Sequence, residues 1–298
     1  VGGTTHSRSI RTWFDQVIDA SWFWLGEGPE LVDPECRGMI ALGDSLGGAL
    51  EVIHQVLSRL SPSADRSWLQ RWQRLELYFT EQAKIDRSLM WGGLVGQVIS
   101  QVLDGQRDRD DDKNQCSDLV IANSMAFRDH DMTWHPRKQS GLAPTARCWV
   151  NRGANGIDGT LSSALGIALG TRSERPLLIW IGDLATYHDL QGLYGLAQWS
   201  YEKHTRPIVV LVSNNGGGGI FKHLPIREGT QFTRLFQTPL HTHDPVFDRS
   251  WCDVARWLRV DQFVKTESTE VLVETLETAV TQPILTMIEV VIDGDIDY

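Results

Sequence analysis

The chain has 298 residues, of which 41% are hydrophobic and 22% are charged, as in folded globular proteins with room for two domains. Its formal net charge of −10 argues against nonspecific nucleic-acid binding, so an anionic ligand would need local basic side chains. No run of 18 consecutive apolar residues occurs, so no membrane span is expected.

The cysteines and the N-terminus bear on the compartment. Cys36, Cys116, Cys148 and Cys252 lack the paired close spacing of a zinc site, and we interpret them as reduced thiols. The chain begins Val1-Gly2-Gly3, with neither an initiator methionine nor the apolar segment of a signal peptide. We therefore expect a cytoplasmic protein.

The first third of the chain shows a strand–helix pattern with too few strands for a complete sheet. A helix is predicted near residues 10–20, short strands at 22–25 and 38–42, and a helix near 48–60. Residues 67–99 are helical by pattern, with an interruption around Trp91-Gly92-Gly93. The charged run at residues 107–114 is typical of a surface loop.

From residue 118 onward, strands and helices alternate regularly. Continuous apolar strands between helices indicate a doubly wound α/β fold with a parallel sheet. We assign residues 91–298 to such a domain and residues 1–90 to part of a preceding central α/β domain. The predicted strands are 118–122, 148–151, 177–181, 208–213 and 284–291, and the predicted helices are 159–169, 190–201, 251–257 and 269–280.

Four polar motifs follow predicted strands. They are Asn123-Ser124, Asn151-Arg152-Gly153, Gly182-Asp183 and Asn214-Asn215. In a doubly wound sheet, ligands bind outside the carboxyl ends of the strands. The four motifs are therefore expected at one edge of the sheet.

Two of these motifs suit a divalent cation bound to a diphosphate. Asp183 follows one apolar strand, and Asn215 with the glycines 216–219 follows another. A hard cation prefers oxygen ligands, and glycines let backbone N–H groups approach phosphate closely. Either motif alone also fits an ordinary turn, but the pair predicts a Mg²⁺–diphosphate site.

Three motifs together resemble the 2-succinyl-5-enolpyruvyl-6-hydroxy-3-cyclohexene-1-carboxylate synthase (MenD) family. They are residues 151–159 (NRGANGIDG), 182–184 (GDL) and 214–225 (NNGGGGIFKHLP), supported by 123–128 and, more weakly, by 7–13. The resemblance implies a thiamine diphosphate enzyme of menaquinone or phylloquinone biosynthesis. Such an enzyme decarboxylates 2-oxoglutarate and joins the remainder to isochorismate.

The same resemblance implies a set of cofactor residues. Asp183, Asn215 and the Gly217 carbonyl would hold Mg²⁺, or Mn²⁺ in its place, against the diphosphate. Ile157 would hold the cofactor in its bent shape, a role compatible with an ordinary core position. The implied cofactor-binding residues are Ile157, Gly182, Asp183, Leu184, Asn215, Gly217 and Gly218.

Both implied substrates are dicarboxylates, for which arginine offers a permanently charged fork. Each of these arginines could also be an ordinary surface residue, and Lys222 and His223 are expected to face solvent. The implied substrate-binding residues are Arg8, Ser124, Arg128 and Arg152, with Ile220, Phe221 and Leu224 forming an apolar wall.

One part of the family pattern does not occur in this sequence. Family enzymes place the cofactor against a pyrimidine-binding domain that supplies an activating glutamate, and nothing in residues 1–100 resembles that domain. We therefore assign no catalytic residue and expect roughly the C-terminal half of a longer protein. That half would be inactive without a pyrimidine-binding domain from the same or another subunit, and the complete protein would be a homodimer or homotetramer.

Two other functions remain open. The chain could belong to a different 2-oxoacid decarboxylase or acetolactate-type ligase, although small neutral acceptors would not need two guanidinium groups. It could also be a non-catalytic module that binds thiamine diphosphate.

Overall fold

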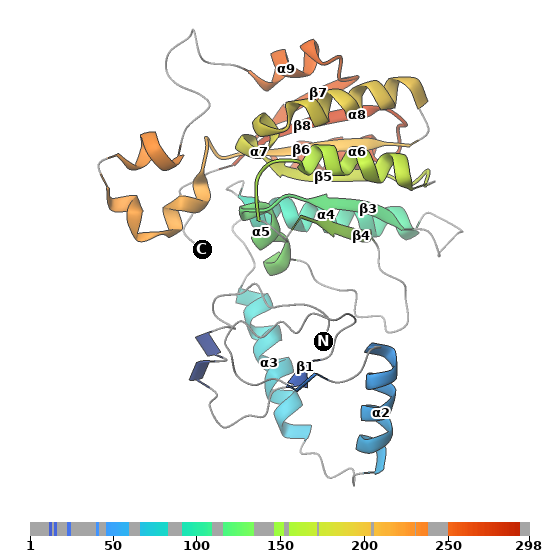
Figure 1. Cartoon of the computed structure of the whole chain (residues 1–298), viewed down its shortest axis with the longest axis vertical. Helices are drawn as coiled ribbons and strands as arrows, with labels where there is room; N and C mark the ends of the chain where they lie inside the picture. Colours follow the sequence, from blue (N-terminus) through green and yellow to red (C-terminus); the bar gives the residue numbers. More distant parts are fainter. Residues whose placement is uncertain are drawn as a thin grey trace. The chain divides into compact units, whose positions relative to one another are not determined.

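A computed structural model describes two units of the chain, residues 1–84 and 85–298 (Figure 1). The assignment of residues 1–90 to part of a central domain stays a prediction. The described residues are 12–13, 15–16, 23–24, 40–41, 46–59, 66–82, 91–108, 116–133, 146–151, 155–171, 173–203, 206–229, 231–237 and 250–292.

The first unit contains the short strands and helices expected from its pattern. The strands β1 (Phe23–Trp24) and β2 (Ile40–Ala41) pair in parallel. The helices are α2 (Leu46–Arg59) and α3 (Arg66–Gln82), and residues 12–13 and 15–16 are also helical.

Six of the described strands in the second unit form one sheet in the order β4-β3-β5-β6-β8-β7, and every pair is parallel. The central strands β3, β5, β6 and β8 are almost entirely buried, which explains their continuous apolar sequences. The strands are β3 (Ser117–Ile121), β4 (Ala146–Val150), β5 (Leu177–Gly182), β6 (Ile208–Asn214), β7 (Gln262–Thr266) and β8 (Leu285–Val291).

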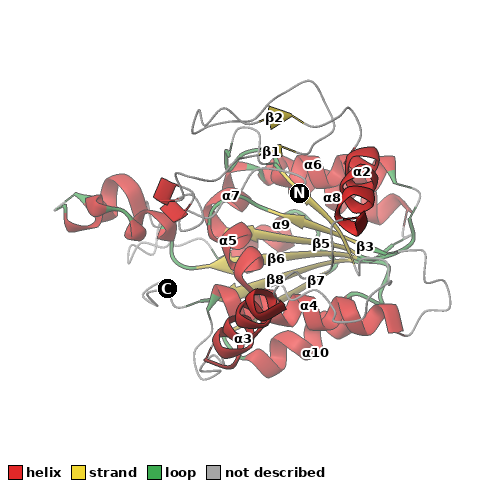
Figure 2. Ribbon diagram, turned by 90° about the horizontal axis from the view of Figure 1, so that it is seen from below, coloured by secondary structure: helices red, strands yellow, loops and turns green. Residues whose placement is uncertain are grey.

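Helices cover both faces of this sheet, as Figure 2 shows. Side chains of α4, α5 and α10 pack against one face, around Leu119 and Trp180, and those of α6, α8 and α9 pack against the other, around Ile179 and Val210. The doubly wound α/β fold is thereby confirmed. The helices are α4 (Gly92–Asp108), α5 (Met125–Thr133), α6 (Thr160–Gly170), α7 (Asp183–His188), α8 (Leu190–Lys203), α9 (Trp251–Trp257) and α10 (Thr269–Ala279).

The structure also corrects parts of the sequence interpretation. The edge strand β7 and the short helices α5 and α7 were not predicted. Helix α4 continues to Asp108, beyond the predicted end at residue 99 and into the charged run. None of the described helices is long and apolar enough to cross a membrane.

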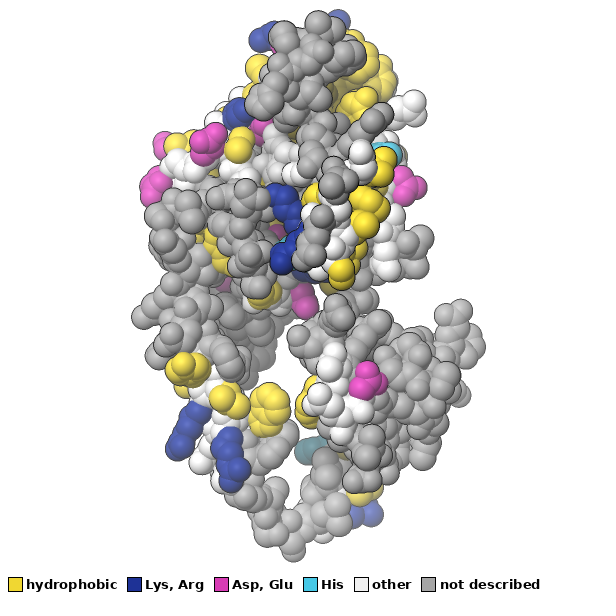
Figure 3. Space-filling view, turned by 90° about the vertical axis from the view of Figure 1, so that its left-hand side faces the viewer, with side chains coloured by type: hydrophobic (Ala, Val, Ile, Leu, Met, Phe, Trp, Pro, Cys, Tyr) yellow, Lys and Arg dark blue, Asp and Glu magenta, His cyan; other side chains and the backbone are white. Residues whose placement is uncertain are grey.

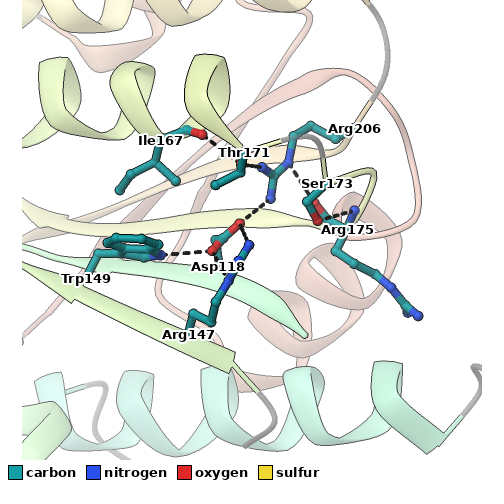
Figure 4. A network of polar contacts seen from close by, with 8 residues as sticks. All are labelled: Asp118, Arg147, Trp149, Ile167, Thr171, Ser173, Arg175 and Arg206. Atoms are coloured by element: carbon teal, nitrogen blue, oxygen red, sulfur yellow. Dashed lines mark hydrogen bonds and ion pairs between the residues drawn. The ribbon is translucent and has the colours of Figure 1, made fainter. Parts of the chain in front are cut away.

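A buried polar network joins strands at the amino-terminal edge of the sheet (Figure 4). Asp118 and Arg206 are 0% and 1% exposed, with 2.9 Å between Oδ2 and Nη2. Arg147 donates two more hydrogen bonds to the same carboxylate, of 2.9 and 3.0 Å, and Trp149 donates one of 2.8 Å. Burial lowers the pKa of the Arg206 guanidinium, while the hydrogen bond and charge of Asp118 act in the opposite direction.

Candidate cofactor and metal site

The strand order of the sheet reverses between β3 and β5: the chain passes from β3 to β4 on one side of this point and from β5 to β6 on the other. The connection from β3 to β4 runs through α5, and the connection from β5 to β6 runs through α7 and α8; α5 and α8 pack on opposite faces. Parallel sheets bind ligands at such a point, outside the carboxyl ends of the strands. Asn123 and Asp183, which follow the two strands, are both buried. The four predicted polar motifs follow four successive strands, β4, β3, β5 and β6.

Asp183 is the first residue of α7 and is 2% exposed. Its Oδ1 accepts a 2.8 Å hydrogen bond from the backbone N–H of Leu184. The N-cap residue of the helix is Gly182, so Asp183 does not serve as its N-cap. A buried carboxylate is thus held at the strand end.

Asn215 follows the neighbouring strand. Gly182 of β5 pairs with Ser213 of β6, so Asp183 and Asn215 follow the ends of two hydrogen-bonded strands. The Asn215 Oδ1 atom is buried and accepts no hydrogen bond from any described residue. A Cβ atom on Gly219 would collide with the Asn215 carboxamide, so any other residue at 219 would have to displace that side chain from its present position.

Gly217 lies in the same loop with φ = 128°, a backbone conformation that residues with a side chain rarely adopt. Its carbonyl accepts a 2.9 Å hydrogen bond from the N–H of Gly219. A carbonyl oxygen has two lone pairs, so one remains for another donor or a cation. The loop therefore offers a backbone oxygen near a carboxamide oxygen.

These groups fit the chemistry of a hard divalent cation. The candidate ligands are a carboxylate, a carboxamide and a carbonyl, all of them oxygen donors. The buried Asn215 oxygen, which accepts no hydrogen bond from a described residue, is the structural observation that supports this fit. Among the described residues, no three His, Cys, Asp or Glu side chains are grouped to hold a metal ion, so the candidate site has one carboxylate and relies on amide and carbonyl oxygens for its other ligands.

Asn151 and residues 155–159 are the described residues that follow β4 and precede α6. Ile157 is half-buried and packs against the hydrophobic cluster of α6 and α8, which agrees with a core role and leaves the cofactor role a prediction. The Asn151 Nδ2 atom donates a 3.0 Å hydrogen bond to Ser163 Oγ on α6. Arg152 and Arg8 lie outside the described residues.

Ser124 directly precedes α5, and Arg128 lies within that helix. Ser124 has φ = 70°, in the left-handed region that non-glycine residues seldom occupy outside special sites. Arg128 is exposed, and its Nη1 donates a 2.8 Å hydrogen bond to the Ser124 carbonyl. This bond holds the guanidinium beside the carboxyl end of β3.

The predicted apolar wall forms part of three short helices after β6: η1 (Gly219–His223), η2 (Pro225–Glu228) and η3 (Thr233–Gln237). Ile220 and Phe221 are half-buried, whereas Leu224 is 45% exposed. Phe221 meets Phe236 edge to face, with 5.7 Å between ring centroids. Phe236 was not among the predicted residues, because its contact depends on how η1 and η3 pack.

Figure 3 faces the side of the molecule on which η1, η2 and η3 lie, and there Lys and Arg side chains stand beside hydrophobic ones. Exposed His223 and half-buried Lys222 belong to η1. A chain with a net charge of −10 thus presents local positive charge on this side, as an anionic ligand would require.

A histidine on α5 lies close to a cysteine on β4. The His130 Nε2 atom is 3.9 Å from Cys148 Sγ. Burial lowers the pKa of His130 to about 4, against the opposing charge of Asp131, and burial also raises the pKa of Cys148. Both groups are neutral near pH 7; His130 is buried and we interpret it as a packing residue, whereas Cys148 is exposed.

A family model described as thiamine pyrophosphate enzyme, C-terminal TPP binding domain, matches residues 135–290. The chain therefore belongs to the thiamine diphosphate enzymes and contains their C-terminal cofactor-binding domain. The benzoylformate decarboxylase structure from Polynucleobacter necessarius superimposes with a TM-score of 0.50 at 19% identity. The superposition covers 72% of this chain and 36% of the decarboxylase chain, and the likeness supports the fold alone.

Within the thiamine diphosphate enzymes, two curated relatives of the chain belong to one synthase family. The 2-succinyl-5-enolpyruvyl-6-hydroxy-3-cyclohexene-1-carboxylate synthase of Bacillus velezensis is 35% identical over 194 residues, 64% of this chain and 29% of that protein. The synthase of Salinibacter ruber is 32% identical over 248 residues, 82% of this chain and 37% of that protein. The resemblance to this synthase family is confirmed, and the chain covers between 29% and 37% of these two relatives.

Proposed function

We propose that this chain supplies the diphosphate-binding half of a 2-succinyl-5-enolpyruvyl-6-hydroxy-3-cyclohexene-1-carboxylate synthase. The substrates would be 2-oxoglutarate and isochorismate, in menaquinone or phylloquinone biosynthesis. A pyrimidine-binding domain of the same or another subunit would complete the site. A homo-oligomeric state and a cytoplasmic location belong to the same proposal.

The observation that best supports this proposal is the placement of Asp183 and Asn215. They follow two paired strands, the carboxylate is buried, and a carboxamide oxygen is buried without a hydrogen bond from the described residues. Mg²⁺ satisfies such oxygens and neutralises a diphosphate at the same time. An ordinary turn would not require a buried, unsatisfied oxygen.

Each residue then has a role in binding or orientation. Asp183, Asn215 and the Gly217 carbonyl would hold Mg²⁺, or Mn²⁺ in its place. Gly182, Leu184 and Gly218 would line the diphosphate, and Ile157 would contact the cofactor with its exposed part. Thiamine diphosphate supplies the electron sink for decarboxylation and carbon–carbon bond formation.

The arginines and the apolar wall would select the substrates. Arg128 and Arg152 would bind substrate carboxylates, with Ser124 beside them and Arg8 as a further basic contact. Ile220, Phe221 and Leu224 would exclude water from the remaining surface. A ligase acting on small neutral acceptors is less well supported because it has no use for two guanidinium groups.

Arg128→Ala and Arg152→Ala, in the complete enzyme, test this assignment. Each removes one charge-assisted contact worth about 1.5–3 kcal/mol, so kcat/KM for a dicarboxylate substrate is expected to fall roughly 10- to 150-fold. The affinity for thiamine diphosphate is expected to stay near wild type. Product formation from 2-oxoglutarate and isochorismate, with pyruvate as the competing 2-oxo acid, is the measurement.

Arg256→Ala is the matched control, because Arg256 lies on α9, is 76% exposed and pairs only with exposed Asp253 among the ion pairs described. It is expected to leave the kinetics unchanged. Wild-type kinetics for both substrates in the Arg128 and Arg152 variants would assign these residues to the surface. Preferential turnover of pyruvate would favour the acetolactate-type alternative.

A further inference from the structure

Asn123 follows β3 and is 4% exposed. Its Nδ2 atom donates two hydrogen bonds to backbone carbonyls, of 2.8 Å to Asn151 and 2.7 Å to Gly156. These acceptors lie 28 and 33 residues away along the chain. One carboxamide thus joins the end of β3 to both ends of the segment that follows β4.

The two hydrogen bonds require a short side chain that donates two hydrogen bonds from one group, which asparagine does. Both acceptors are carbonyl oxygens, so the NH₂ group, with its two donors, must face them. An aspartate would present oxygens to oxygens, and a serine or threonine has only one O–H to donate. Because the Asn123 side chain is buried, a replacement that cannot donate loses both hydrogen bonds and gains no contact with water in their place.

The segment held in this way includes Arg152 and leads directly into Ile157. Its start is also anchored by the Asn151 side chain on Ser163 of α6. Near its end, Asn155 has φ = 54°, a left-handed conformation that surrounding contacts must maintain. The two carbonyls bound by Asn123, those of Asn151 and Gly156, flank Asn155 in the sequence.

We propose that Asn123 is a positioning residue: it clamps Asn151 and Gly156, the two ends of the stretch of chain that contains Arg152, and so fixes the backbone just before Ile157. The identity of the ligands at that edge rests on the proposed function. The clamp itself is a property of the chain and can be measured without substrate.

Asn123→Asp tests the clamp while keeping the shape of the side chain. Backbone hydrogen exchange of residues 151–157 is expected to become about tenfold faster or more than in wild type at pH 7.5, because two hydrogen bonds from a buried side chain are lost. Lowering the pH protonates the new carboxyl group, which can then donate to one carbonyl. Part of the protection, relative to wild type at the same pH, is therefore expected to return.

Two further variants separate the clamp from general stability. Asn123→Ala removes both donors at every pH, so its faster exchange is expected to show no recovery on acidification. Ser163→Ala removes the neighbouring bond to Asn151 but leaves the clamp, and it is expected to change exchange at residues 151–157 much less. The buried strand β6 serves as an internal reference in each variant.

In the complete enzyme, Asn123→Asp is also expected to raise KM for the dicarboxylate substrates more than it lowers kcat, and to regain affinity at lower pH. Unchanged exchange at residues 151–157 in both Asn123 variants would overturn the proposal. An equal increase in β6 would also overturn it, since that would indicate a purely structural role. Because exchange needs no substrate, failure of the carboligation assay in wild type would refute the proposed function and leave the clamp intact.

Discussion

Replacing Asp118 by asparagine is expected to destabilise the folded protein by about 3–5 kcal/mol, the cost typical of breaking a buried ion pair. The substitution leaves the Arg206 guanidinium, 1% exposed, without its counter-charge in the interior. Arg206 also donates to the Arg175 carbonyl and to Thr171 Oγ1, so it cannot turn to solvent without breaking those bonds. The free energy of unfolding in urea is the measurement.

Asp253→Asn provides a matched control. Asp253 and Arg256 form an ion pair of 3.1 Å on α9, but their side chains are 68% and 76% exposed. Exposed pairs contribute little, so this variant is expected to lose no more than about 0.5 kcal/mol. A loss below about 1 kcal/mol for Asp118→Asn would mean that Arg206 finds water or another partner after a small rearrangement.

Replacing Asp183 by alanine is expected to abolish Mg²⁺-dependent binding of thiamine diphosphate. It removes the only charged ligand among the three proposed for the cation. The affinity is expected to fall by more than about 100-fold, because losing even a group in the outer shell of a metal site typically costs 10- to 100-fold. Calorimetric titration of thiamine diphosphate, with Mg²⁺ and with a chelator, measures the change.

The exposed Asp253→Ala variant controls for loss of negative charge and is expected to bind as wild type does. The unfolding free energy of Asp183→Ala should be measured alongside, so that binding is compared between folded proteins. Unchanged Mg²⁺-dependent affinity in folded Asp183→Ala would refute the assignment of Asp183 as a ligand.

The sheet and the edge at which the candidate site lies could be predicted from the sequence. Strands buried on both faces have continuous apolar sequences, such as residues 177–181 and 208–213, and these fell on β5 and β6. The polar residues directly after such strands then had to lie at one edge, because all the strands are parallel. Asp183 and Asn215 were identified in this way as candidate ligands, and their role stays a prediction.

Elements at the margin of the sheet gave no such signal. Strand β7, with the sequence QFVKT, pairs only with β8 at the edge of the sheet and is mostly half-exposed, so its pattern is short and mixed. Helix α7 has six residues, fewer than two full turns. Periodicity cannot distinguish segments this short from loops.

Contacts between residues far apart in the chain could not be predicted from the sequence pattern. Asp118 and Arg206 are 88 residues apart along the chain; Asp118 lies on β3 and Arg206 precedes β6, and only β5 lies between these two strands in the sheet. The two hydrogen bonds of Asn123 likewise depend on β4 pairing with β3. Asparagine after a strand suggested a turn or a ligand, and only the structure showed that it binds the backbone of another loop.

The most direct test of the central claim is a crystal of the protein with thiamine diphosphate and Mn²⁺, measured at the manganese absorption edge. Mn²⁺ prefers the same oxygen ligands as Mg²⁺ and can be located by its anomalous signal. The account predicts one strong peak bound by the Asp183 carboxylate, the Asn215 carboxamide oxygen and the Gly217 carbonyl, with the diphosphate beside it. A cofactor bound with its metal away from the ends of β5 and β6 would contradict the account.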